Sequence, residues 1–194
     1  MASTIVARNY AEILYTLATR HGGDTTVDQY GDAINDVAAL LEREPRVREF
    51  LETPRVDVDA KKRVIESAFG GRVPDLFLRF LLIVVEKRRQ AALRKIAEQY
   101  HDIVDEARNR VRAEIRLARE ADADLREDIV SSIEGRLGKT VLPSFEVDPS
   151  LIGGVVIRAG GQILDGSVRR RAAGLRQRLL KARLPAATTA ETSY

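Results

Sequence analysis

The chain has 194 residues, 31% of them charged, with a net charge of only +3 and no cysteine. Such a composition is typical of a soluble globular protein with one large or two small domains, and it excludes disulfide bonds, thiolate zinc sites and cysteine nucleophiles. The longest apolar run, 76–85, is about half the ~20 residues of a membrane-spanning helix, so we expect no direct membrane insertion.

Helical periodicity dominates the first 108 residues, where apolar side chains recur three and four positions apart. Glycine and proline supply the breaks, for example at Gly22-Gly23, Thr53-Pro54 and Gly70-Gly71. The predicted helices span about 4–20, 24–41, 45–51, 58–69, 75–88 and 93–107. The pattern therefore predicts an all-α six-helix bundle as the N-terminal domain, residues 1–108.

The predicted fifth helix is unusual because it is apolar around most of its circumference. Only Arg79 and Glu86 mark a narrow polar stripe within it. A helix of this kind must be covered nearly all round. Two interpretations stay open: the helix is the centre of the bundle, or one of its sides borders a groove that accepts a helix from a partner.

The period changes near Asn109. Residues 111–117 alternate strictly between apolar and charged side chains, as do 144–148, which indicates half-buried strands. A helix over 122–137 separates them, and Ala159-Gly160-Gly161 predicts a hairpin turn inside 155–164. With a last helix over 167–183, these elements predict a small α/β C-terminal domain spanning 109–183, followed by a disordered tail over 184–194.

No pattern in the chain predicts a catalytic, cofactor-binding or metal site. Gly138-Lys139-Thr140 resembles the end of a phosphate-binding loop, but the glycine required five positions before Gly138 is Ile133. A helix also precedes this segment and a strand follows it, the reverse of that motif, so Gly138 is better interpreted as a helix C-cap. His21 and His101 are too far apart in the sequence to predict a site.

The last predicted helix is strongly basic. Its cationic residues are Arg169, Arg170, Arg171, Arg176, Arg178, Lys181 and Arg183. Three interpretations stay open: a solvated helix, a contact with an acidic protein, or a contact with nucleic acid. Val168, Leu175 and Leu179 recur at helical spacing, and we expect them to hold this helix against the sheet.

Two segments resemble one family. Residues 7–18 (ARNYAEILYTLA) resemble its opening helix, and 148–160 (DPSLIGGVVIRAG) with 165–169 (DGSVR) resemble its C-terminal signature. The family is the delta subunit of bacterial F-type ATP synthase, equivalent to the mitochondrial oligomycin-sensitivity-conferring protein. The resemblance extends to about Arg183 and so covers most of the chain.

The resemblance implies a non-catalytic stator subunit that couples rotation to proton-driven ATP synthesis and needs no cofactor. It further implies that the N-terminal domain binds the N-terminal helices of alpha subunits. The C-terminal domain would bind the b subunits of the peripheral stalk. One copy per complex would lie peripherally at the cytoplasmic face of the bacterial plasma membrane. The competing hypotheses are a helical nucleic-acid-binding protein that uses the basic last helix, and a phosphate-binding enzyme built on Gly138-Lys139-Thr140.

Two sets of residues are predicted to be important, one for binding a partner and one for the structure of the C-terminal domain. The groove that accepts the alpha-subunit helix is expected between the first and fifth helices, at Ala7, Tyr10, Ala11, Leu14, Phe77, Phe80, Leu81 and Val84. The structural signature is Gly153, Gly154, Gly160, Asp165 and Gly166. Gly154 in particular is expected to have a positive φ or to lie against another backbone segment, because it stands where the strand 155–157 begins and the family signature places a glycine there.

Overall fold

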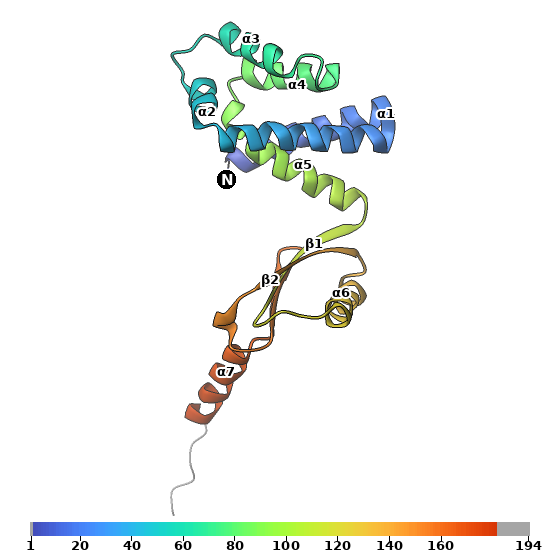
Figure 1. Cartoon of the computed structure of the whole chain (residues 1–194), viewed down its shortest axis with the longest axis vertical. Helices are drawn as coiled ribbons and strands as arrows, with labels where there is room; N and C mark the ends of the chain where they lie inside the picture. Colours follow the sequence, from blue (N-terminus) through green and yellow to red (C-terminus); the bar gives the residue numbers. More distant parts are fainter. Residues whose placement is uncertain (1, 182–194) are drawn as a thin grey trace, which may run out of the picture. The chain divides into compact units, whose positions relative to one another are not determined.

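The computed structural model describes residues 2–181, and the chain divides into two compact units, Met1–Arg108 and Asn109–Tyr194 (Figure 1). The first unit is helical. Its elements are α1 (Ala2–Arg43), α2 (Pro45–Glu52), α3 (Val58–Phe69), α4 (Asp75–Glu86), η1 (Gln90–Ala92) and α5 (Leu93–Ala107). A helical first domain is confirmed, whereas the count of six separate helices is not.

The count differs because α1 comprises two helical halves that meet at a kink at Gly23, with no loop between them. Only Gly23 leaves the helical region, with φ 63° and ψ −148°, and helix resumes directly on both sides. Both halves of α1 contact α5 through Tyr100. The Tyr100 ring lies 6.5 Å from that of Tyr15, and its hydroxyl donates a 2.8 Å hydrogen bond to the carbonyl oxygen of Val27. The chain therefore turns back at Gly23, although no loop separates the two halves.

α4 is buried along most of its length and packs against α3 and α1. Five of its side chains are buried, among them Phe77, whose ring lies 5.7 Å from that of Tyr30. Gln90, just after α4, donates a 2.7 Å hydrogen bond to the carbonyl oxygen of Leu51 and so ties η1 to α2. On α4 itself, Ile83 remains 51% exposed. Burial within the bundle therefore accounts for most of the apolar circumference of α4. A narrow apolar strip remains at the surface.

The second unit is a mixed sheet with helices. Its elements are β1 (Arg110–Leu117), α6 (Ala123–Leu137), β2 (Thr140–Val147), η2 (Pro149–Leu151), β3 (Val155–Ala159), β4 (Gln162–Asp165) and α7 (Val168–Lys181). The strand order is β2-β1-β3-β4, with β1 and β2 parallel and the other pairs antiparallel. The α/β domain is confirmed. The predicted tail, 184–194, lies outside the described residues.

Local chemistry explains where these elements begin and end. Asp122 caps α6, since its carboxylate accepts a 2.9 Å hydrogen bond from the backbone N–H of Leu125. Gly138 ends α6 with φ 63°, so its interpretation as a C-cap is confirmed. β2 begins earlier than the alternation indicated because Pro143 interrupts the pattern. Proline is tolerated there because β2 is an edge strand, paired with β1 alone.

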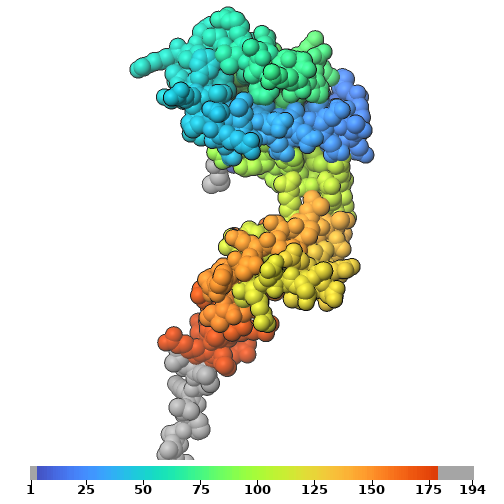
Figure 2. All heavy atoms as spheres, viewed as in Figure 1, coloured from blue at the N-terminus to red at the C-terminus, as the bar shows by residue number. Residues whose placement is uncertain are grey.

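The core of the second unit lies between the sheet and α6. Every second residue of β1, from Val111 to Leu117, is buried, and Ile133 of α6 packs against the same cluster. The expectation that Leu175 helps to hold α7 against the sheet is wrong, since Leu175 is 59% exposed. Indeed, every described side chain from Val168 to Arg178 is exposed. On the face seen in Figure 2, α7 (red) stands at the end of the unit with no other element over it.

Candidate partner-binding surfaces

The predicted groove residues lie together, but almost all of them lie inside the protein. Tyr10 of α1 and Phe80 of α4 make an edge-to-face ring contact at 6.2 Å, which joins the two helices. Tyr10 is partly exposed, and the other predicted residues are buried: Ala7, Ala11, Leu14, Phe77, Phe80, Leu81 and Val84. These buried residues can support a binding surface, but they cannot line one.

A second apolar stripe on α1 lies nearer the solvent. It consists of Val6, Tyr10, Ile13 and Leu17, spaced at i, i+4, i+7 and i+11, and we call it the α1 stripe. Ile13 is 53% exposed, and the other members are partly buried. On α4, Leu76 and Ile83 flank Phe80 at i−4 and i+3, on the side that meets Tyr10. Helical spacing therefore places Leu76 and Ile83 on the same side of α4 as the ring that contacts α1.

The signature glycines sit where β3 begins beside the corner between β4 and α7. Gly154 has φ +86°, and a Cβ there would collide with the carbonyl oxygen of Gly166 and lie 3.0 Å from Cα of Ser167. The backbone N–H of Gly166 donates a 2.9 Å hydrogen bond to Val155, and that of Val168 donates one of 3.0 Å to Gly153. Two backbone segments are thus pinned together where side chains cannot fit.

The other two signature residues shape turns. Gly160 has φ +56° and Gly161 has φ +76°, the pair of positive angles that a two-residue hairpin turn requires. Asp165 accepts a 2.9 Å hydrogen bond from the backbone N–H of Ser167. Hydrogen bonding to Ser167, by its side chain and its backbone, holds the pKa of the Asp165 carboxyl below its usual value. The same arrangement with Ser150 lowers the pKa of Asp148.

These carboxylates predict acid sensitivity of the second unit. A pKa that is lowered by folding stabilises the protein above the unfolded-state value of about 4, and this stabilisation is lost as the pH falls through the lower folded-state value. The melting temperature of the second unit should therefore drop below about pH 4. In Asp165→Asn the amide still accepts the hydrogen bond but does not titrate, so the drop should be smaller. An identical pH profile for the two proteins would contradict this prediction.

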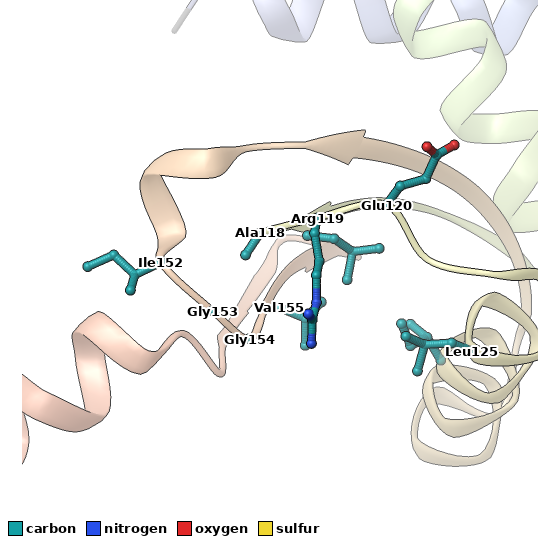
Figure 3. A pocket seen from close by; sticks show the side chains of 10 residues that line it. Ala118, Arg119, Glu120, Leu125, Ile152, Gly153, Gly154 and Val155 are labelled. Atoms are coloured by element: carbon teal, nitrogen blue, oxygen red, sulfur yellow. The ribbon is translucent and has the colours of Figure 1, made fainter.

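A groove of about 520 Å³ opens beside α6, between the end of β1 and the start of β3 (Figure 3). Its walls include Leu117, Leu125, Ile129, Val155 and the 152–154 backbone, with Arg119 and Glu120 as the charged members. Figure 3 shows Leu125 and Ile152 at opposite ends, with Arg119 between them. Leu125 is 48% and Ile152 75% exposed. This surface was missed by sequence analysis, where Ile152 appeared only within the glycine signature.

The two units present apolar surfaces and an exposed basic helix. Within residues 2–181, no group of three His, Asp or Glu side chains is placed to hold a metal ion. No described helix is long and apolar enough to cross a membrane. The class defined by this fold and these surfaces is a two-domain binding protein.

Comparison with known proteins gives the family. The sequence profile of the ATP synthase delta (OSCP) subunit family matches residues 6–179, so the chain belongs to that family. The ATP synthase subunit delta of Gemmatimonas aurantiaca is 41% identical over 90% of this chain and 92% of its own length. The ATP synthase subunit delta of Desulforamulus reducens is 37% identical over 90% of this chain and 95% of its own length.

A solved structure is similar in fold. A chain in the cryo-EM structure of the Toxoplasma gondii mitochondrial ATP synthase hexamer aligns with a TM-score of 0.64, covering 92% of this chain and 98% of the other. The sequence identity is 20%, so this match concerns the fold alone. The similarity nevertheless spans both units, which means that the helical unit and the α/β unit occur together in another chain.

Proposed function

We propose that this chain links the catalytic head of F-type ATP synthase to its peripheral stalk, with the first unit on the head and the second on the stalk. Membership of the delta (OSCP) family makes the chain a non-catalytic stator subunit. The observation that carries the proposal is the family match over residues 6–179, which includes both units. Rotation of the central stalk exerts torque on the head, and a stator link prevents the head from turning with it.

On the first unit, the partner is the N-terminal helix of an alpha subunit. The α1 stripe and the neighbouring Leu76 and Ile83 supply an apolar strip at helical spacing. An amphipathic helix buries its own apolar face against such a strip through residues at i, i+3, i+4 and i+7. Phe80 and the other buried groove residues then form the rigid floor beneath the contact.

On the second unit, the partner is the b-subunit part of the stalk. α7 supports this because Arg169, Arg170, Arg171, Arg176 and Arg178 are all exposed along it. Exposed cations contribute more to the association rate and to orientation than to affinity. The competing nucleic-acid hypothesis for this helix gains no support from the family match.

A protein of this family works within a membrane-associated complex. We place this chain at the cytoplasmic face of the bacterial plasma membrane, held there by its partners, in one copy per complex. Tight association with a long residence time is the property that such a joint needs, and apolar helix contacts supply it mainly through slow dissociation.

The test is purification of the tagged full chain from native membranes of its host. We expect the alpha and b subunits to co-purify in stoichiometric amounts. Membranes stripped of the chain should hydrolyse ATP without pumping protons, and adding the purified chain should restore pumping. Co-purification of nucleic acid without these subunits, or full coupling in stripped membranes, would refute the proposed function.

A further inference from the structure

Ile152 has the most unusual backbone among the described apolar residues of the second unit, 109–181. Its φ is 65° and its ψ −40°, a region that β-branched residues almost never adopt because of steric strain. Its side chain is 75% exposed, so packing within the unit does not compensate for the strain. Strain of this kind persists where the surroundings fix it, and it concentrates at functional sites.

The surroundings fix this backbone from both sides. On one side, Asp148 accepts a 2.9 Å hydrogen bond from the N–H of Ser150, and the N–H of Ile152 donates to Pro149 at 3.3 Å. On the other side, the side chain of Arg169 donates to the carbonyl oxygen of Ser150 at 2.9 Å. The loop is therefore rigid, and it presents Ile152 to the solvent at the rim of the groove.

The groove continues into the root of α7. A Cβ on Gly153, which lines the groove, would lie 3.0 Å from Cγ2 of Val168, so the first side chain of α7 covers this glycine. Val168 is 45% and Leu175 59% exposed, and they lie on one side of the helix, at i and i+7. Residues 168–181 contain five arginines and one lysine and no acidic residue. An apolar surface thus runs from the groove to a strongly basic helix.

We infer that the groove and α7 together bind one amphipathic helix with acidic residues on its flanks, and that Ile152 is its principal apolar anchor. The apolar face of that helix would cover Leu125, Val155 and Ile152, while its carboxylates would face the arginines of α7. This inference rests on the proposed function, because it takes the helix to be the membrane-distal end of the b subunits. It adds where on the second unit that helix binds.

The experiment compares the full chain with three variants, using the soluble part of the b subunits as the probe. Ile152→Ala and Ile152→Gly should each weaken b-subunit binding about tenfold or more, as expected of an anchor residue. Ile163→Ala is the matched control, because Ile163 is also exposed, at 62%, and its neighbour Leu164, partly buried, is the residue of β4 that pairs with Ile157. Its affinity should stay within about twofold of the unmodified chain.

A second readout separates an anchor from a structural residue. Ile152→Gly removes the strain, so its melting temperature should be equal to or above that of the unmodified chain even as binding weakens. Association should also slow as salt is added, since the arginines attract an acidic helix.

The outcomes distinguish the two proposals. If the unmodified chain does not bind the b subunits, the proposed function fails and the inference fails with it. If binding occurs but all three variants bind equally, the inference alone is wrong. A salt-independent association rate contradicts the acidic flanks. Dimerisation of the chain that Ile152→Ala abolishes would mean that a second copy occupies the groove, which also overturns the inference.

Discussion

Gly154→Ala is expected to destabilise the second unit strongly while the first unit keeps its stability. The added Cβ would collide with the carbonyl oxygen of Gly166, and backbone atoms that are pinned by hydrogen bonds cannot easily move away. The φ of +86° adds strain for any side chain. Together these effects should destabilise the second unit by about 3 kcal/mol or more, a large part of the stability of a small domain.

Calorimetry of the full chain measures this effect, since two compact units can give two melting transitions. Only one of them should shift downward in Gly154→Ala. Gly161→Ala is the control: φ there is +76°, but no atom lies within 4 Å of its Cβ position. It should lose only about 1 kcal/mol, from the positive φ alone. Equal losses in the two variants would mean that close approach at Gly154 has no energetic role.

The signature segment therefore combines two kinds of constraint. Gly154 is required by folding, because two backbones meet there. Ile152, two positions earlier, is unfavourable for folding, since its backbone is strained and its side chain is exposed. Local sequence rules that favour the fold at one position and oppose it at a neighbouring one are typical of a functional site. This contrast distinguishes Ile152, as a binding residue, from the glycines, which serve the fold.

Much of the fold could be predicted because its signals are local. The alternation in β1, the Asp122 cap and the Gly138 stop each depend on a few neighbouring residues. What the sequence did not reveal depends on tertiary context. The helix resumes directly after Gly23 because both halves of α1 pack on α5, and Pro143 is accepted because β2 has no second neighbour.

The binding surface was harder to predict for a geometric reason. α1 carries two apolar stripes side by side, one through Ala7, Ala11 and Leu14 and the other through Tyr10, Ile13 and Leu17. Periodicity finds both, but only packing against α4 and α5 decides which one faces inward. The small residues of the first stripe allow close helix contact, so they are buried. The larger residues of the second stripe remain nearer the solvent.

Two adjacent residues of α4 provide the sharpest test of this distinction. Val84 is fully buried, whereas Ile83 is 51% exposed and lies at i+3 from Phe80, which contacts Tyr10 of α1. Val84→Asp would place an unpaired charge in the core and should cost more than about 4 kcal/mol, enough to unfold the first unit. Ile83→Asp keeps the core intact, so the stability of the first unit should change by no more than about 0.5 kcal/mol.

Although Ile83→Asp should leave the stability unchanged, it should weaken binding of the partner helix. Ile83→Asp, still folded by circular dichroism, should bind an alpha-subunit N-terminal peptide about tenfold or more weakly, because a carboxylate would replace an apolar contact. Val64→Asp is the matched control, since Val64 is likewise exposed, at 42%, but lies on α3. Titration of the peptide into each folded variant gives the affinities. If Ile83→Asp and Val64→Asp bind the peptide equally well, the helix does not dock along the seam of α1 and α4, and the head contact must be sought on another face of the first unit.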